Sequence, residues 1–198
     1  MVVDRAELGA NLARFYDFRA KSVLYVGAGI GQVLRPTTGV ASIVAIDRDP
    51  DSLEGFRSES KTVWAGIPVK FVPQKFETVT LRGDVVYFEF CMHMMDDPRD
   101  ALEHARTLAQ EVVIIDHLPK SKWVYYWAGE DPVGRSTRAI ESFGVRRKKE
   151  LSAEQRFEDW SELAARLSGE GAESHRRVNE LKGAVDIRMR MDYCLYLL

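Results

Sequence analysis

Short apolar runs that alternate with amphipathic segments are the feature of this sequence that most constrains its fold. The runs have the length of buried strands, and the segments between them carry apolar residues at helical spacing, which is typical of α/β domains with a parallel sheet. The expected strands lie at residues 22–31, 42–50, 69–72, 84–90 and 111–116, and the expected helices at 4–19, 51–62 and 98–110. This part of the chain therefore predicts a doubly wound, mostly parallel sheet.

The remaining segments carry different patterns. Residues 32–40 are short for a crossover helix and predict barely two helical turns, interrupted near Pro36. Residues 156–171 predict an amphipathic helix, and 173–181 a strand. Residues 184–198 alternate apolar and charged side chains in their first half, which predicts a long strand with one solvated face that becomes fully buried at its end. We therefore expect the chain to close on an antiparallel hairpin.

Length and composition favour a single domain over residues 1–198. The 28 Lys and Arg residues nearly balance the 30 Asp and Glu residues, so no overall field attracts nucleic acid or a membrane. Two cysteines and four histidines show no zinc-site spacing, and no metal is predicted. The N-terminus lacks the apolar core of a signal peptide, so we expect a cytosolic protein, and the sequence leaves its oligomeric state open.

Three glycines and one distant acid indicate a nucleoside site. Gly27, Gly29 and Gly31 directly follow the first strand, where the turn into the next element presents free backbone N–H groups. Asp47 ends the second strand 20 residues after Gly27, where a carboxylate can accept hydrogen bonds from two ribose hydroxyls. The glycines alone are equally compatible with a plain turn, but together with the acid they predict an adenosine-like ligand.

The residue after the third glycine limits the choice of ligand. The dinucleotide fingerprint G-x-G-x-x-G requires a glycine where this chain has Gln32, which disfavours a pyrophosphate. No G-K-[ST] follows the glycines, so P-loop chemistry is excluded. A nicotinamide-dependent oxidoreductase stays an alternative, for which NADH binding by fluorescence is a simple test.

Four segments resemble the successive motifs of a known family. VLYVGAGIG, AIDRDP, DVVYFEFCMHMMDDP and EVVIIDHL are similar to those of class I, Rossmann-like S-adenosylmethionine-dependent methyltransferases, especially small-molecule enzymes of the ubiquinone-biosynthesis type. The resemblance covers residues 20–118, and the C-terminal strands fit it by pattern only. It implies a seven-stranded sheet with an antiparallel last strand, S-adenosylmethionine as cofactor, a cofactor-binding core at 20–118 and a substrate-side lid at 119–150.

The resemblance also implies which residues surround the cofactor. Gly27, Ala28 and Gly29 would face its methionine part, and Asp47 its ribose. The adenine would lie beside Arg48 and the segment Gln74, Lys75 and Phe76. The segment Glu89, Phe90 and Cys91 would approach the amino acid end.

Two positions depart from the family pattern. Tyr25 stands where the family usually has an acid two residues before the first glycine, a carboxylate that helps to anchor the cofactor's ammonium group. We infer that Glu89 supplies this charge instead, the alternative being that Glu89 is simply solvated. Lys75 stands where family members often have an Asp that reads the adenine amino group, so backbone groups near Phe76, with help from Gln74, are expected to read it here.

Methyl transfer from a sulfonium requires alignment, a dry cavity and sometimes a base. His93 is the leading candidate for that base, because it follows the fourth strand at the sheet edge where ligands bind. The alternative is a histidine packed under Met94 and Met95. His117 ends the fifth strand at the same edge and is the second candidate.

Large rings follow the fifth strand within the turn-rich segment 117–134, in which a helix is expected to begin near Pro132. Trp123, Tyr126 and Trp127 are predicted to cover a flat or apolar acceptor. Packing of these rings on the sheet is the competing interpretation.

The segment 135–149 holds six basic residues against one glutamate. An RNA methyltransferase is therefore an alternative, but no RNA-binding module or stacking pattern accompanies this segment, and a solvated helix end or capture of an acidic small molecule fits it better. The predicted function is methyl transfer from S-adenosylmethionine to a small molecule. A noncatalytic S-adenosylmethionine-binding protein is a further alternative.

Overall fold

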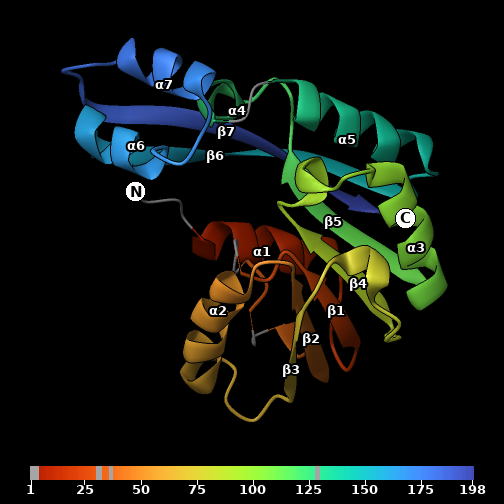
Figure 1. Cartoon of the computed structure of the whole chain (residues 1–198). Coiled ribbons are helices and arrows are strands. Elements are labelled where there is room, and N and C mark those ends of the chain that lie inside the picture. Colours follow the sequence, from red (N-terminus) through yellow and green to blue (C-terminus); the bar gives the residue numbers. More distant parts are fainter. Residues whose placement is uncertain (1–4, 30–32, 36–37, 128–129) are drawn as a thin grey trace.

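A single mixed sheet organises the protein in a computed structural model that describes residues 5–29, 33–35, 38–127 and 130–198 (Figure 1). Its strand order is β3-β2-β1-β4-β5-β7-β6. The strands are β1 (Ser22–Val26), β2 (Ser42–Asp47), β3 (Val69–Pro73), β4 (Val85–Glu89), β5 (Glu111–His117), β6 (Arg147–Asp159) and β7 (Val185–Leu197). Strands β1 to β5 are parallel, and β7 runs antiparallel to both β5 and β6. The predicted fold class is confirmed.

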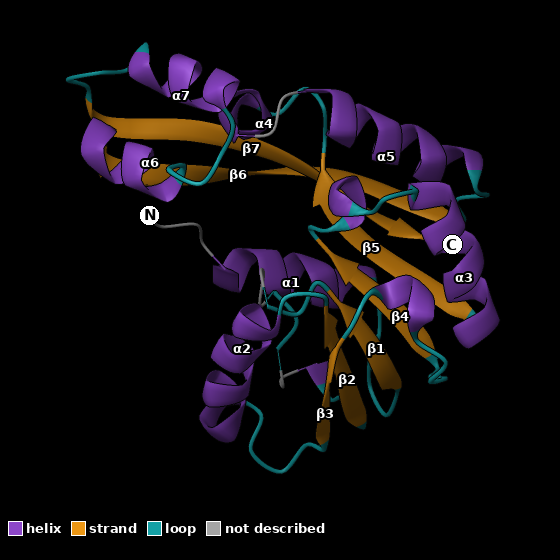
Figure 2. Cartoon of the chain, viewed as in Figure 1, coloured by secondary structure: helices purple, strands orange, loops and turns teal. Residues whose placement is uncertain are grey.

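Helices cover both faces of the sheet (Figure 2). They are α1 (Arg5–Phe15), α2 (Pro50–Val63), η2 (Phe76–Thr78), η3 (Met92–Met94), α3 (Pro98–Leu108), α4 (Lys122–Trp127), α5 (Glu130–Ser142), α6 (Trp160–Arg166) and α7 (Ala172–Asn179). Tyr25 of β1 packs in the apolar core that also holds residues of α1 and α2. Its neighbours Leu24 and Val26 pack in the second core, with residues of α3 and α5. There are two cores because successive side chains of a strand point to opposite faces of the sheet.

The two long antiparallel strands extend beyond the parallel part of the sheet. Residues 193–197 of β7 pair with β5, whereas its first half pairs with β6 alone. Helices α6 and α7 lie beside this extension, and α4 lies close to it (Figure 1). The C-terminal segment thus forms a projecting layer next to the carboxyl ends of β4 and β5.

Two predictions for the C-terminal third were wrong. Residues 173–181 were expected as a strand, but residues 172–179 form α7, which buries Ser174 and Val178 one helical turn apart. The partner of the last strand is instead β6, at residues 147–159, and the helix expected at 156–171 is only α6. Residues 147–150 of β6 are exposed at an edge of the sheet, where charged side chains are tolerated.

The connection between β1 and β2 also differs from expectation. Its described residues, 33–35 and 38–41, contain no α-helix. Val33 and Leu34 are buried instead, on the side of the sheet that packs against α1. Asp4, the first residue of the helix expected at 4–19, lies outside the described residues, as do Gly31, Gln32 and Pro36.

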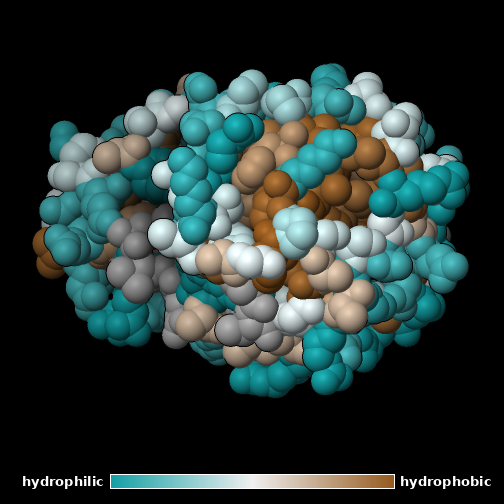
Figure 3. All heavy atoms as spheres, turned by 90° about the horizontal axis from the view of Figure 1, so that it is seen from below, coloured by the Kyte–Doolittle hydropathy of each residue, from teal (hydrophilic) through white to brown (hydrophobic). Residues whose placement is uncertain are grey.

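One part of the sheet has a thin cover. Between β3 and β4 the only helix in residues 74–84 is the three-residue η2. Val44 and Leu81 are accordingly only partly buried, and Lys70 of β3 is exposed. Figure 3 shows an apolar area on the surface of the molecule seen from below.

None of the helices in the described residues has the length and apolar character needed to cross a membrane.

Candidate functional site

A pocket lies at the carboxyl ends of the parallel strands. It encloses about 490 Å³ of space, part of it open to solvent. Strand β1 is flanked by β2 on one side and by β4 on the other, and this reversal of strand order is where open α/β sheets bind their ligands. We call it the first pocket, and it is lined by Val26, Gly27, Ile46, Asp47, Arg48, Gln74, Lys75, Phe76, Glu77, Cys91, Met94, Met95 and Asp96.

Many of the residues predicted to surround the cofactor line this pocket. The structure brings together Gly27, Asp47, Arg48, Gln74, Lys75, Phe76 and Cys91. Four other predicted residues do not line it, namely Ala28, Gly29, Glu89 and Phe90. Six other residues that line the pocket were not predicted, namely Val26, Ile46, Glu77, Met94, Met95 and Asp96. Residues 94–96 lie in the segment after β4, so the rule that placed His93 at this edge of the sheet also applies to them.

Asp47 connects the ends of the first two strands. Its Oδ2 atom accepts a hydrogen bond from the Gly29 N–H at 3.3 Å, and its Oδ1 atom accepts one from the Asp49 N–H at 3.0 Å. The backbone N–H groups of Gly27 and Ala28 donate to the Ile46 carbonyl, at 3.0 and 3.4 Å. The carboxylate is therefore held in place by the backbone while it lines the first pocket.

The glycine turn packs too closely for side chains. Gly27 has a φ of +74°, and an added Cβ would lie 2.8 Å from the Cβ of Cys91 and 2.9 Å from the Glu89 carbonyl oxygen. A Cβ on Gly29 would lie 2.3 Å from the Cβ of Ser52 in α2. These contacts explain why glycine is needed at both positions.

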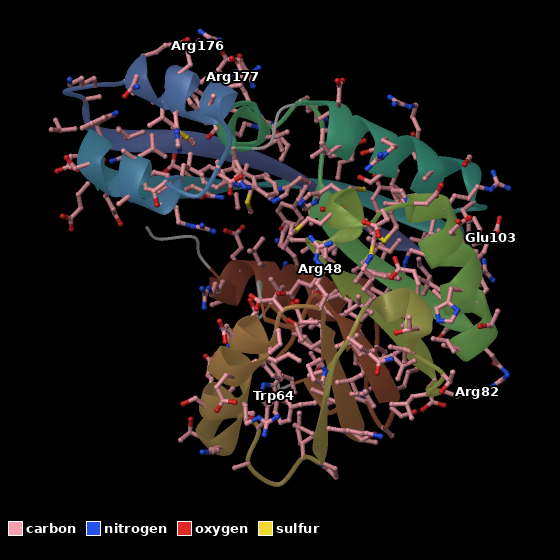
Figure 4. All side chains as sticks on the ribbon, viewed as in Figure 1. Arg48, Trp64, Arg82, Glu103, Arg176 and Arg177 are labelled. Atoms are coloured by element: carbon pink, nitrogen blue, oxygen red, sulfur yellow. The ribbon has the colours of Figure 1, made fainter. Side chains whose placement is uncertain are left out.

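An ion pair spans the other side of the first pocket. The Nζ atom of Lys75 lies 2.8 Å from Oδ2 of Asp96, and both side chains are exposed. Gln74 donates to the Thr78 hydroxyl at 3.1 Å, and the Phe76 ring is buried against Phe88. Figure 4 shows Arg48 near the centre of the molecule, whereas Arg82 and Glu103 lie at its periphery.

Glu89 lies behind the glycine turn and is fully buried. Its Oε2 atom accepts hydrogen bonds from the hydroxyls of Tyr25 at 2.6 Å and Tyr87 at 2.8 Å and from the Leu34 N–H at 3.2 Å, while Oε1 accepts from the Val33 N–H at 2.8 Å. Burial raises the pKa of this carboxyl, and the four donors oppose that effect. The alternative that Glu89 is solvated was therefore wrong.

His93 and Asp116 form a buried pair between η3 and β5. The Nδ1 atom of His93 lies 2.8 Å from Asp116 Oδ1, and the His93 backbone N–H donates to Oδ2 at 3.2 Å. The His117 N–H also donates to Asp116, at 2.9 Å. Burial alone would raise the pKa of Asp116, but His93 and these hydrogen bonds hold it below its usual range. The Nε2 atom of His93 has no partner among the described residues.

His117 is a poor candidate for a base. Its ring packs on Phe90, with the ring centroids 4.6 Å apart, and its Nδ1 atom is buried without a partner among the described residues. Burial lowers its pKa to about 4. The imidazole is therefore neutral at physiological pH, and it packs as an aromatic ring.

The low pKa of His117 predicts a pH-dependent stability. Below its unfolded pKa of 6.5 the unfolded chain binds a proton that the native ring does not bind until about pH 4, so stability falls as the pH drops through this range. The full effect is about 3 kcal/mol. His117→Phe, which keeps a ring on Phe90, should remove this part of the pH dependence. Urea unfolding at several pH values measures it, and an unchanged dependence would contradict the assignment.

Three comparisons with known proteins bear on this geometry. Residues 24–114 match the family described as a methyltransferase domain. The YcgJ protein from Bacillus subtilis has a TM-score of 0.66 at 14% identity, covering 97% of both chains. An S-adenosylmethionine-dependent methyltransferase from Aquifex aeolicus has a TM-score of 0.58 at 16% identity, covering 98% of this chain and 89% of that one. Magnesium protoporphyrin IX methyltransferase from Synechocystis, solved with bound S-adenosylmethionine, has a TM-score of 0.56 at 12% identity, covering 97% and 77%. No curated protein matches.

The chain thus has the Rossmann-like methyltransferase fold, and residues 24–114 match a methyltransferase domain. The cofactor of such a domain is S-adenosylmethionine, and the residues of the first pocket fit this group. A carboxylate held at the end of β2 faces the glycine turn, which has no room for side chains of its own. The vicinal hydroxyls of a ribose suit this carboxylate.

Within the segment predicted as a lid, residues 119–150, the aromatic residues lie in the helix α4. Trp123 of α4 is buried, with its ring stacked between those of Trp127 and Phe157 at centroid distances of 6.4 and 5.9 Å. Tyr126 is buried as well. Trp127 is half-buried and donates from Nε1 to Glu170 at 2.8 Å. Core packing thus accounts for Trp123 and Tyr126, while Trp127 borders a second cavity beyond His93.

The basic segment 135–149 is divided between two elements, so only its first half is a helix end. Its first half lies in α5, and β6 begins at Arg147. Lys148 lies 2.6 Å from Glu141 and 3.0 Å from Glu150, and Arg146 lies 3.5 Å from Glu111. Two of its six basic side chains, Arg146 and Lys148, are therefore paired with carboxylates.

Proposed function

We propose that this protein transfers a methyl group from S-adenosylmethionine to a small-molecule acceptor. The observation that carries the proposal is the first pocket, where the carboxylate of Asp47 and the backbone of Gly27 face one cavity at the switch point of the sheet. The ion pairs of Arg146 and Lys148 reduce the positive charge available to RNA, which supports a small-molecule acceptor. A cytosolic location and the ubiquinone-biosynthesis subtype stay predictions.

The residues of the first pocket would act by binding and orientation. Asp47 would hold the ribose hydroxyls, and Arg48 with residues 74–76 would surround the adenine. Gly27 would contact the methionine part. When bound, S-adenosylmethionine supplies a methyl group on a positively charged sulfur. Correct placement of two reactants can lower the barrier by about 7–11 kcal/mol, so the shape of the cavity contributes more than any one titrating group.

Substitution of Asp47 tests the proposal. Asp47→Ala should weaken the binding of S-adenosylhomocysteine at least tenfold, because it removes an acceptor of the ribose hydroxyls. Asp47→Asn keeps one acceptor oxygen and should weaken binding less. Isothermal titration calorimetry gives both affinities, and circular dichroism checks the fold.

A nearby acid provides the matched control. Asp51 is exposed in the first turn of α2 and does not line the first pocket, so Asp51→Ala should leave the affinity unchanged. Equal affinities of wild type and a folded Asp47→Ala protein would remove Asp47 from the site. Incubation with labelled cofactor and a cell extract separates an enzyme, which labels a recoverable metabolite, from a noncatalytic binding protein.

A further inference from the structure

Strand β6 (Arg147–Asp159) forms one edge of the sheet. It pairs with β7 on one side, and no strand of the described residues lies on its other side. Natural proteins usually keep edge strands short or interrupt them with proline or a bulge, because the free N–H and C=O groups can pair with another chain. This edge is 13 residues long and contains neither proline nor glycine. Its backbone is therefore that of a strand to which another strand can be added.

The two faces of β6 have different surroundings. From residue 151 onward the odd-numbered side chains are buried or partly buried. The even-numbered side chains at positions 148–158 are all exposed, and all but Ser152 are charged. A second copy that extends the sheet about a two-fold axis keeps these faces aligned, so an even-numbered residue lies opposite an even-numbered residue. The axis therefore passes through a residue and not between two residues.

The order of the charges along β6 selects one position of this axis. With the axis at Ala153, Lys148 of one copy lies opposite Glu158 of the other, and Glu150 lies opposite Arg156. The two-fold symmetry forms each of these pairs of opposite charge twice. Opposite charges that face each other across two strands stabilise the pairing. The small side chain of Ala153 also leaves room for its own copy on the axis.

Neighbouring positions of the axis bring like charges together. With the axis at residue 152, Lys148 would lie opposite Arg156, and Glu150 would lie opposite Glu154. With the axis at residue 154, Glu154 would lie opposite its own copy. Like charges directly opposite each other destabilise a strand pair. The charge pattern thus specifies one register, whereas charges that serve only to block an edge need no such order.

Two arginines that face each other within one copy support the same register. Arg156 of β6 lies directly opposite Arg188 of β7. Glu154 lies 2.6 Å from Arg156 and 3.9 Å from Arg188, so one carboxylate serves both guanidinium groups, and Asp186 lies 3.1 Å from Arg188. In the selected register, Glu150 of a second copy comes to the side of Arg156 that faces away from β7. It would give Arg156 a second carboxylate.

We infer that the free edge of β6 binds a second copy of this chain, as an antiparallel strand pair about a two-fold axis at Ala153. This inference is independent of the proposed function, because it uses no residue of the first pocket. Exposed ion pairs are individually weak and are screened by salt. We therefore expect a reversible dimer with a Kd in the micromolar range, and 1 M NaCl should shift it toward the monomer.

A cysteine on the axis tests the register. Directly opposite residues of an antiparallel pair have Cα atoms about 4.5–5.5 Å apart, a spacing that a disulfide can span. Ala153→Cys should therefore form a disulfide-linked dimer in oxidised glutathione, measured by non-reducing gel electrophoresis. Lys149→Cys is the matched control, because Lys149 is more exposed but would lie about 26 Å from its own copy along the strand. The native Cys91 and Cys194 are both buried.

Charge reversal tests the pairing of Glu150 with Arg156. Glu150→Lys and Arg156→Glu each place like charges opposite each other, so each variant should dimerise at least tenfold more weakly than the wild type. A mixture of the two variants should dimerise again, because each copy supplies the charge that the other lacks. Glu154→Lys is the control, since it reverses a charge on the same face of β6 that lies opposite the neutral Ser152. Sedimentation equilibrium measures each Kd, and circular dichroism checks each fold.

The outcomes separate this inference from the proposed function. The inference is overturned by a wild type that sediments as a monomer at about 100 µM in low salt, or by equal crosslinking of Ala153→Cys and Lys149→Cys. A dimer that both charge reversals leave unchanged also overturns it, as does a mixture of the two variants that stays monomeric. All folded variants should bind S-adenosylhomocysteine as the wild type does. Failure of the wild type to bind this ligand contradicts the proposed function alone.

Discussion

Gly27→Ala is expected to lower the free energy of unfolding by about 3 kcal/mol and to weaken S-adenosylhomocysteine binding at least 100-fold. The φ of +74° costs about 1–2 kcal/mol for any residue with a Cβ. The added atom would also lie 2.9 Å from the Glu89 carbonyl oxygen, a backbone atom that can move only if β4 moves. Urea unfolding measures the first effect and calorimetry the second.

Gly66 provides a matched control for the conformational cost of a positive φ. Its φ is +85°, but an added Cβ would meet no atom within 4 Å. Gly66→Ala should therefore show the conformational cost alone, about 1–2 kcal/mol, with ligand affinity unchanged. The difference between the two variants measures the crowding at the glycine turn. Equal losses of stability would show that the turn has room for a side chain.

The central parallel strands could be predicted because they are buried on both faces. All five residues of β4 are buried, so the strand reads as a continuous apolar run with sharp ends. Asp97 caps α3 by accepting the N–H groups of Arg99 and Asp100, and Pro98 begins the helix, which are both local signals. Local sequence is therefore sufficient to predict a strand that is buried along its length or a helix that begins with a capping residue.

The antiparallel edge could not be predicted in the same way. Strand β6 buries only two side chains, Gln155 and Phe157, and its charged residues face solvent, so its pattern resembles that of a solvated helix end. Its strand character comes from pairing with β7, a contact between residues far apart in sequence. Helix α7 likewise depends on two buried positions, too few for a helical period to be recognised.

The candidate site likewise combines features that local sequence predicts with features that only long-range contacts create. Gly27 and Asp47 follow strands that the sequence predicts, and the edge rule places them together. The four donors around Glu89 come from β1, β4 and residues 33–34, and only the folded chain brings them to one carboxylate. The sequence shows that Tyr25 replaces the acid that the family usually has at this position. Only the folded chain shows that the Tyr25 hydroxyl donates a hydrogen bond to Glu89.

Glu89→Ala is expected to destabilise the protein by about 4 kcal/mol, because it leaves two tyrosine hydroxyls and two backbone N–H groups without their acceptor. Glu89→Gln has nearly the same shape but replaces one acceptor oxygen by a donor, so it should cost about half as much. Glu103→Ala is the control, because that glutamate is exposed and lies at the periphery (Figure 4). Thermal and urea unfolding measure the three variants.

Ligand affinity in Glu89→Gln separates two roles of this carboxylate. If Glu89 supplies the charge that anchors the ammonium group, the substitution weakens S-adenosylhomocysteine far more than methylthioadenosine, which lacks the amino acid part. Its oxygens are fully buried and bonded to protein donors, so we expect it to act through residues 33–34 and to weaken both ligands by the same factor. A selective loss for S-adenosylhomocysteine would show that the carboxylate faces the ligand. An equal loss identifies Glu89 as the anchor of the segment after the glycine turn, with Tyr25 as one of its donors.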